Sequence, residues 1–91
     1  MIELTTTILA QKDHVASDLG GEIVILDLES GTYYGLNEVG KAIWDLVQKQ
    51  VTVAEIRDNL LQEYDVESDR CEREVVALLE QMAAQGLIEI R

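Results

Sequence analysis

The sequence predicts an α+β domain in which a small antiparallel sheet comes first and three helices follow. Short β-branched or alternating runs, separated by glycine turns, fill the first third of the chain. The rest carries three stretches with apolar residues at helical spacing, bounded by helix start and stop signals. The chain has 91 residues, no internal repeat and no linker-like segment, so we expect one domain spanning residues 1–91.

The strongest strand signal is "EIVILDLE", residues 22–29. Its apolar residues fall on both faces, with Val24, Leu26 and Leu28 on one and Ile23 and Ile25 on the other. Such a pattern predicts a central strand or one covered on both sides.

Weaker strand signals surround this segment. "TTTILA" and "HVASDL" precede it, and the second of them ends in a turn at Gly20 and Gly21. "TYYGL" returns after a short turn at Gly31, and "LIEI" at residues 87–90 suggests a terminal strand.

The first helix is expected to begin after Asn37, whose side-chain oxygen can cap it. Its core stripe comprises Val39, Ala42, Ile43, Leu46 and Val47. Trp44 falls about 100° from Ile43 around the helix, so we place it at the margin of the stripe.

Two further helices follow. Thr52 and Glu55 have the spacing of a capping box and mark the start of the second. The third should run from about Ser68 to Gln85, with Gly86 as a left-handed stop. Its buried stripe comprises Cys71, Val75, Leu78, Leu79 and Met82. Three closely joined helices beside a small sheet predict a winged-helix-like arrangement with the strands placed first.

The charge balance narrows the possible partners. The chain has seven Lys and Arg and 18 Asp and Glu, which gives a formal net charge of −11. Nucleic acid and anionic membranes attract clustered positive charge, which this chain lacks, so we expect neither as a partner. A basic or largely apolar peptide or protein would meet the least repulsion.

Sequence features also predict a cytoplasmic location. A single cysteine cannot form an internal disulfide, which fits a reducing compartment. The N-terminal residues lack a signal-peptide pattern, and no apolar run approaches the roughly 20 residues that span a bilayer.

No residue pattern indicates catalysis or a metal site. His14 is the only histidine and Cys71 the only cysteine, whereas a zinc site usually takes about four nitrogen or sulfur ligands. We therefore interpret His14 as an ordinary surface residue and Cys71 as a small apolar residue of the helix stripe. The prediction is a protein that is not an enzyme, with no cofactor and no metal.

Binding at a sheet edge is the remaining possibility. In "TYYGL", Tyr34 and Leu36 share one face and Tyr33 and Gly35 the other. One tyrosine can then pack inward while the other lines a groove, and an extended peptide can pair with the free strand edge. The alternative, that both tyrosines only seal the sheet against the helices, stays open.

Three stretches together resemble the PqqD-like family of peptide-recognition domains. They are "VILDLESGTYYGLNEVGKAIWDLV", "TVAEIRDNLLQEYDV" and "EREVVALLEQMAAQGLI", and the resemblance covers about residues 13 to 90. These domains are the RiPP recognition elements, which bind leader peptides of ribosomally synthesised and post-translationally modified peptides. The "YYGLN…IW" version looks most like the small stand-alone proteins of lasso-peptide clusters. Where relatives often have Pro at the first turn of the third helix, this chain has Ser68.

The resemblance implies a three-stranded antiparallel sheet on a winged-helix-like trio of helices. It also implies that a leader peptide pairs antiparallel with the third strand, in a cleft against the third helix, and is delivered to a processing enzyme. In this chain the strand is Thr32, Tyr33, Tyr34, Gly35 and Leu36. Helical phase leads us to expect the opposite wall from Arg70, Arg73, Val76, Ala77 and Glu80.

The implied partners are a precursor leader peptide and either a leader peptidase or another modifying enzyme such as a radical enzyme or a cyclase. Two alternatives remain at this point. One is a winged-helix DNA-binding module, which the excess of acids in the third helix disfavours. The other is a structural module whose edge strand pairs with a second copy to form a homodimer. A carrier protein is disfavoured because no "DSL"-type attachment serine opens a helix.

Overall fold

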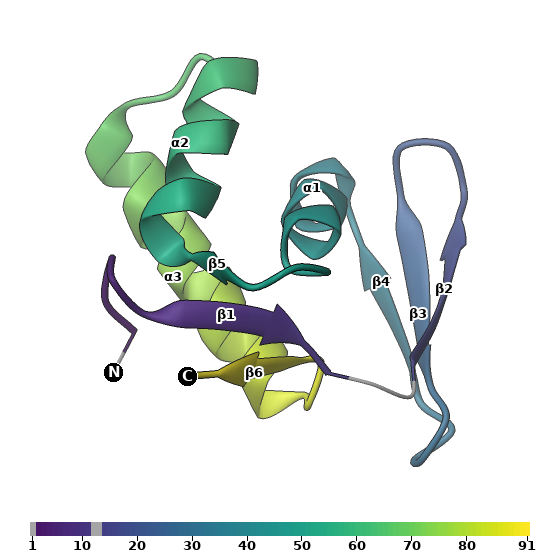
Figure 1. The fold of residues 1–91 in the computed structure, drawn as a ribbon. Coiled ribbons are helices and arrows are strands. Elements are labelled where there is room, and N and C mark those ends of the chain that lie inside the picture. The colour runs from purple at the N-terminus through teal and green to yellow at the C-terminus, as the bar shows by residue number, and fades with distance from the viewer. Residues whose placement is uncertain (1, 12–13) are drawn as a thin grey trace.

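The computed structural model describes residues 2–11 and 14–91, which form two small sheets and three helices (Figure 1). In chain order the elements are β1 (Thr7–Ala10), β2 (His14–Asp18), β3 (Ile23–Asp27), β4 (Tyr33–Leu36), α1 (Glu38–Leu46), β5 (Val51–Thr52), α2 (Val53–Glu63), α3 (Ser68–Ala84) and β6 (Ile88–Ile90). The predicted α+β class, the three helices and an antiparallel three-stranded sheet near the N-terminus are confirmed.

The N-terminal sheet has the strand order β2-β3-β4. Ile25 of β3 pairs with Ala16 of β2 on one side and with Tyr34 of β4 on the other. Gly31 has a φ of 73°, which a glycine adopts without strain in the turn between β3 and β4. The central position of β3 is as predicted, and β4 lies at an edge.

A second sheet, with the order β5-β1-β6, joins the two ends of the chain. Ile8 of β1 pairs with both Val51 and Ile90, so the first predicted strand does not belong to the N-terminal sheet. In Figure 1 this sheet lies below α2 and in front of α3, apart from the β2-β3-β4 sheet. Its partners are more than 40 residues away from β1 in sequence, and local patterns carry no information on such a pairing.

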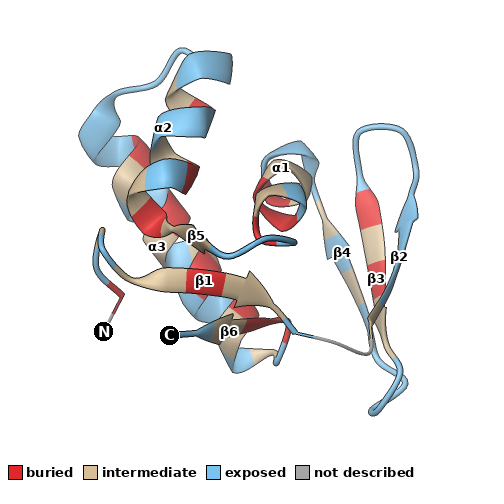
Figure 2. Ribbon diagram, viewed as in Figure 1, coloured by how far each residue is buried: buried red, intermediate tan, exposed pale blue. Residues whose placement is uncertain are grey.

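The core lies between the helices, the β5-β1-β6 sheet and one face of the β2-β3-β4 sheet. Ile23 and Ile25 are buried, whereas Val24 and Leu26 on the other face are half-buried and Leu28 is 56% exposed. Figure 2 shows this alternation along β3, with α1 on its buried side. Of the two predicted alternatives, the structure shows the central strand, because β3 lies between β2 and β4 and every described helix lies on the same side of the sheet.

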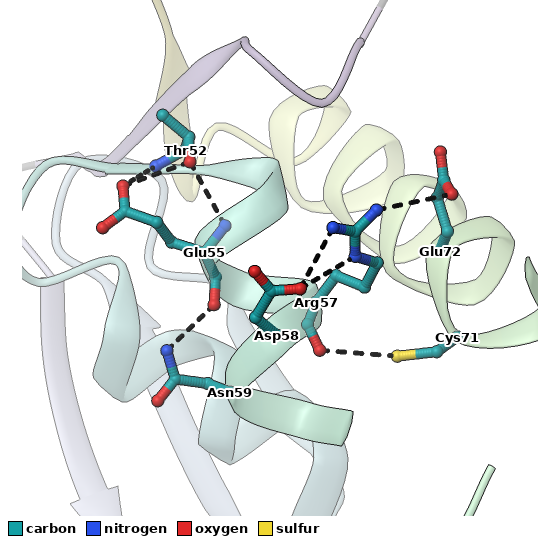
Figure 3. Close-up of polar contacts among 7 residues, drawn as sticks. All are labelled: Thr52, Glu55, Arg57, Asp58, Asn59, Cys71 and Glu72. Atoms are coloured by element: carbon teal, nitrogen blue, oxygen red, sulfur yellow. Dashed lines mark hydrogen bonds and ion pairs between the residues drawn. The ribbon is translucent and has the colours of Figure 1, made fainter. Parts of the chain in front are cut away.

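The helix boundaries follow the predicted caps. The side chain of Asn37 accepts a hydrogen bond from the backbone N–H of Gly40 at 3.0 Å. At the start of α2, the Thr52 N–H donates to Glu55 Oε1 at 2.9 Å and the Glu55 N–H donates to Thr52 Oγ1 at 3.2 Å, forming a capping box (Figure 3). The third helix begins at Ser68 without a side-chain cap, and Gly86, at a φ of 76°, follows its end.

Contacts between α2 and α3 are partly polar. Arg57 of α2 lies 3.0 Å from Asp58 and 3.8 Å from Glu72 of α3 (Figure 3). The Cys71 thiol faces the Arg57 carbonyl oxygen at 4.0 Å. The two helices pack side by side, and the side of α3 that has Cys71, Val75 and Met82 also faces β4.

Trp44 and His14 differ from their predicted positions. Trp44 is only 5% exposed instead of lying at a margin, and the His14 ring packs edge-on against it, with 6.1 Å between ring centres. His14 is half-buried, not an ordinary surface residue. Its Nδ1 lies 3.2 Å from the Gln11 carbonyl oxygen, a hydrogen bond that places the proton on Nδ1.

Among residues 2–11 and 14–91, no helix has both the length and the apolar content required to cross a bilayer.

Candidate functional site

The open edge of β4 presents backbone groups in a defined order. The Asp27 N–H donates to the Thr32 carbonyl at 2.9 Å, so Thr32 directs its carbonyl toward β3. Alternate residues of an antiparallel strand direct their N–H and C=O groups to opposite sides. Tyr33 and Gly35 therefore point two N–H and two C=O groups away from β3, toward the open edge.

The two adjacent tyrosines point to opposite faces, as predicted. Tyr34 lies opposite the buried Ile25, is half-buried and packs against the core. Tyr33 lies opposite Leu26 and is 68% exposed. The sheet core uses one of the two rings and leaves the other in solvent.

A groove of about 590 Å³ runs between β4 and α3. Its walls come from β4, α1, the end of α2 and α3, which are brought together by the fold. The lining residues are Tyr33, Tyr34, Gly35, Leu36, Asn37, Val39, Gly40, Ile43, Leu60, Tyr64, Val66, Cys71, Glu74, Val75, Leu78, Gln81, Met82 and Gln85. This groove combines a free strand edge with a mostly apolar lining.

The α3 wall is the helix's own core stripe. Cys71, Val75 and Met82 are buried at its base, and Leu78 is half-buried. Glu74 is the one charged side chain among the lining residues, and its carboxylate lies 3.1 Å from Arg70. A groove with this lining suits uncharged side chains at its base and polar groups at its rim.

The predicted helix wall lies on a different side of α3 from this groove. Two residues along an α-helix rotate the side chain by about 200°, so Val76 and Glu80 point away from the side that carries Leu78. With Arg73 and Ala77 they line a separate depression together with Glu67, Asp69 and Glu72. Arg70 borders the groove only through its ion pair with Glu74.

This difference between the predicted wall and the groove lining has a physical cause. The apolar stripe of α3 was identified from its periodicity, but a stripe has two margins and the sequence does not say which one faces the sheet. The structure places the Glu74 and Gln81 margin beside β4. Of the predicted site residues, the structure brings the four from Tyr33 to Leu36 to the groove, whereas Thr32 is not among the lining residues. Four of the five helix residues lie on another face.

The groove is bordered by close packing of β4 on α1 and by a hydrogen bond between α1 and α2. A Cβ on Gly40 would stand 3.0 Å from the Leu36 Cβ, so the absence of a side chain lets the strand approach the first turn of α1. The Tyr64 hydroxyl donates to Glu38 Oε1 at 3.3 Å, which connects the end of α2 to the start of α1. Sequence reasoning missed Tyr64 and Glu74 as groove residues. Tyr64 follows the buried Val53, Ile56 and Leu60 of α2 at helical spacing.

Two groups of the groove, the Cys71 thiol and the Tyr64 hydroxyl, have raised pKa values. Burial raises the pKa of the Cys71 thiol, with a smaller contribution from Glu74. Burial also raises the pKa of Tyr64, and the nearby Glu38 carboxylate adds to the effect. Within residues 2–11 and 14–91, no three His, Cys, Asp or Glu side chains are placed to hold a metal ion.

Comparison with known proteins identifies the family. The family profile described as "Coenzyme PQQ synthesis protein D (PqqD)" matches residues 22–88. A solved structure described as "TbiB1 in Complex with the TbiA(beta) Leader Peptide" is 33% identical with a TM-score of 0.83, over 89% of this chain and 94% of that one. A second, "Lasso peptide synthetase B1 complexed with the leader peptide", is 24% identical with a TM-score of 0.80, over 90% of this chain and 96% of that one.

No curated protein sequence matches this chain. The family profile covers most of the sequence, and the likeness to TbiB1 extends over nearly the whole of both chains. The chain therefore belongs to the PqqD family of RiPP recognition elements, which are non-catalytic binding modules.

Proposed function

We propose that this protein binds the leader peptide of a ribosomally synthesised precursor by adding it as a fourth strand at the edge of β4. The observation that carries the proposal is the coincidence of an unpaired strand edge with an apolar groove of about 590 Å³. Both similar solved structures are complexes with a leader peptide, which supports the same class of ligand here.

Backbone pairing would provide affinity that depends little on sequence. The free N–H and C=O groups of Tyr33 and Gly35 are the pairing partners for an added antiparallel strand. The position of this edge is set on the β3 side by backbone hydrogen bonds and side-chain contacts of Thr32, Tyr34 and Leu36.

Side-chain pockets would provide specificity. Alternate residues of an added strand point to the same face, so every second leader residue would enter the groove between β4 and α3. We propose that Leu78, with the buried Val75 and Met82 behind it, receives apolar leader side chains. Arg73, Val76, Ala77 and Glu80 stay predictions as peptide contacts, which this groove does not support.

The cellular role we propose is delivery. Binding one end of a precursor raises the effective concentration of the remainder at an enzyme that holds the recognition element. The likeness to the lasso peptide synthetase B1 structure favours a lasso precursor. We propose a leader peptidase as the enzyme that receives it. We also propose that the three helices have a winged-helix-like arrangement.

DNA binding has no comparable support. The exposed side of α3 opposite the groove has Glu67, Asp69, Glu72 and Glu80 around a single arginine, Arg73. Such a surface repels phosphates. The winged-helix DNA-binding alternative is accordingly not proposed.

Fluorescence anisotropy with the labelled leader segment of the precursor encoded beside this gene tests the proposal. We expect saturable binding that unlabelled leader reverses and a scrambled leader of the same composition does not. Absence of binding by the folded protein would contradict leader recognition.

Amide hydrogen exchange tests the strand addition separately. On leader binding, the Tyr33 and Gly35 amides should become protected, whereas the Tyr34 amide, which points toward β3, is the internal control. Equal protection at all three positions, or none, would contradict pairing at this edge even where the leader binds.

A further inference from the structure

A second depression, of about 410 Å³, lies between α1 and α2. It shares Leu60 and Tyr64 with the groove beside β4, so the two hollows adjoin near the end of α2. The hydrogen bond from the Tyr64 hydroxyl to Glu38 Oε1 marks their boundary, because Tyr64 lines both hollows and Glu38 lines only the second. We call this depression the α1-α2 notch.

The base of the notch is apolar. Ala42 and Leu46 of α1 are half-buried there, and Leu60 of α2 is buried. Such a base accepts methylene groups. A long side chain with a charge at its end can lie on it while the charged group stays at the rim.

The rim of the notch is acidic. Glu38, Asp45 and Glu63 are exposed there. Lys41 is the one basic residue of the lining, and its ammonium group already lies 3.0 Å from Asp18. Among the described residues, neither Asp45 nor Glu63 belongs to an ion pair. The rim therefore has negative charge that the described chain does not neutralise.

The end of α2 adds to this negative potential. Its last residues line the notch, and its last turn has no basic side chain. Carbonyl groups at the C-terminus of a helix attract cations. A metal ion is not indicated, because no three His, Cys, Asp or Glu side chains of the described chain are placed to hold one. The notch instead fits an organic cation on an aliphatic stem, which is the side chain of lysine or arginine.

The direction of an added strand places one part of the leader beside the notch. Strand β4 runs from Tyr33 to Leu36, and α1 begins two residues later at Glu38. A peptide that pairs antiparallel with β4 runs the other way, so its N-terminal end leaves the groove at Leu36. Glu38 and its partner Tyr64 lie at this end. The leader residues that precede the paired segment would then reach the notch.

We propose that the α1-α2 notch binds a lysine or arginine of the precursor that lies N-terminal to the segment paired with β4. This inference rests on the proposed function. Strand pairing by itself lets a peptide slip by two residues, because the same faces and the same backbone bonds are then restored. A charged side chain held in the notch fixes both the register and the direction of the leader.

The double variant Asp45→Asn/Glu63→Gln removes two charges from the notch. Neither residue lines the groove, and neither takes part in the Tyr64 hydrogen bond. The control is Glu3→Gln/Glu80→Gln, which makes the same change of charge at two exposed residues outside both hollows. Circular dichroism should give both variants a Tm close to that of the wild type.

The probe is the labelled leader of the precursor encoded beside this gene, in two forms. One form is native, and in the other the lysines and arginines of the N-terminal half are replaced by glutamine. At low ionic strength, anisotropy should show native leader binding to the notch variant about three- to tenfold more weakly than to the wild type. The control should differ from the wild type by less than about twofold. In about 0.5 M salt the effect of the notch variant should largely vanish.

The glutamine-substituted leader completes a double-mutant cycle. It should bind the wild type and the notch variant equally, because the charge that the notch recognises is already absent. Equal affinity of these two proteins for the native leader would overturn the proposal, as would a leader with no lysine or arginine in its N-terminal half. A loss that persists with the substituted leader, or that the control shares, would overturn it in favour of a general attraction to an acidic protein.

Failure of the proposed function would look different. A wild type that binds neither form of the leader would refute leader recognition, and this inference with it. Saturable binding of both forms without the coupling would overturn the notch alone and leave leader recognition intact.

Discussion

A Cβ placed on Gly40 would stand 3.0 Å from the Cβ of Leu36, so strand β4 and the first turn of α1 touch at a point with no spare room. Leu36 is fixed by the backbone of β4, and Gly40 by its hydrogen bond to Asn37. The edge strand therefore sits at a distance from α1 that only glycine allows, and the width of the groove depends on that distance.

Gly40→Ala should destabilise the protein although alanine is the better helix former. The gain in helix propensity of about 1 kcal/mol is outweighed by overpacking of about 1–3 kcal/mol. We expect a fall in Tm of several degrees, measured by circular dichroism. Gly35→Ala, where an added Cβ meets nothing within 4 Å, is the matched control. A rise in Tm for Gly40→Ala would show that β4 moves to admit the methyl group.

Tyr34→Ala and Tyr33→Ala should separate stability from binding. Tyr34 packs on the core, so its truncation should cost about 2 kcal/mol of unfolding free energy. Tyr33 is mostly exposed and should cost little stability while weakening leader binding. Urea denaturation and leader anisotropy on both variants give the comparison. Equal losses of stability would contradict the assignment of the two rings to opposite faces.

Leu78→Glu and Val76→Glu test which side of α3 faces the leader. Leu78 lines the groove and Val76 lines the separate depression, and both are half-buried. A carboxylate at position 78 would be desolvated by a bound peptide, so leader affinity should fall at least about tenfold. Val76→Glu should leave affinity near that of the wild type. The reverse ranking would return the leader to the face that helical phase first suggested.

Thr52→Ala removes one half of the capping box at the start of α2. Loss of the hydroxyl that accepts the Glu55 N–H bond should cost about 1 kcal/mol. Thr52→Ser keeps that oxygen and should recover most of the loss. Thermal unfolding of the three proteins measures it. Equal destabilisation by Ala and Ser would indicate that the methyl group of Thr52, and not the cap, stabilises this region.

Asp18→Asn should change how stability depends on pH. The hydrogen bond with Lys41, 3.0 Å away, is the main cause that lowers the pKa of Asp18, followed by the Gly20 N–H. A carboxyl with a lowered native pKa stabilises the fold above its unfolded pKa of about 3.9 and loses this contribution as the pH falls through the native pKa. The variant should thus have a lower Tm at pH 7, and the difference should shrink toward pH 3.

The control for this pH series is Asp65→Asn, an exposed aspartate outside the ion pairs of the described residues. Its Tm difference from the wild type should be small and should not follow the same pH course. Salt should also reduce the Asp18 difference, because screening weakens an exposed ion pair. A Tm difference for Asp18→Asn that is constant between pH 7 and pH 3 would contradict the role of the Lys41 pair.

Features that depend on neighbouring residues were predictable from the sequence. The Asn37 cap, the capping box of Thr52 and Glu55, and the left-handed Gly86 all depend on contacts within a few residues. The opposite orientations of Tyr33 and Tyr34 follow from the period of two in a strand. The edge strand as a candidate binding segment came from the same local reasoning.

Features that depend on distant residues were not predictable. Trp44 is buried and contacts His14, which lies thirty positions earlier in the chain. The partners of β1, and the face of α3 that meets β4, are likewise set by elements far apart in the chain. An apolar helix face can be oriented with either of its two edges toward a sheet, and the local conformational energy of the helix is similar in both cases.

By itself the sequence determined the class of fold, the helix limits, the acidic and non-catalytic character and the strand that carries the free edge. These properties arise from composition and from periodicities of 2 and 3.6 residues, which are complete within one element. The tertiary structure decided which side of α3 lines the groove, that one face of the sheet stays uncovered, and that β1 joins the chain's end. Each of these is a choice among packings that the same local pattern permits, and only the summed burial of distant side chains selects one.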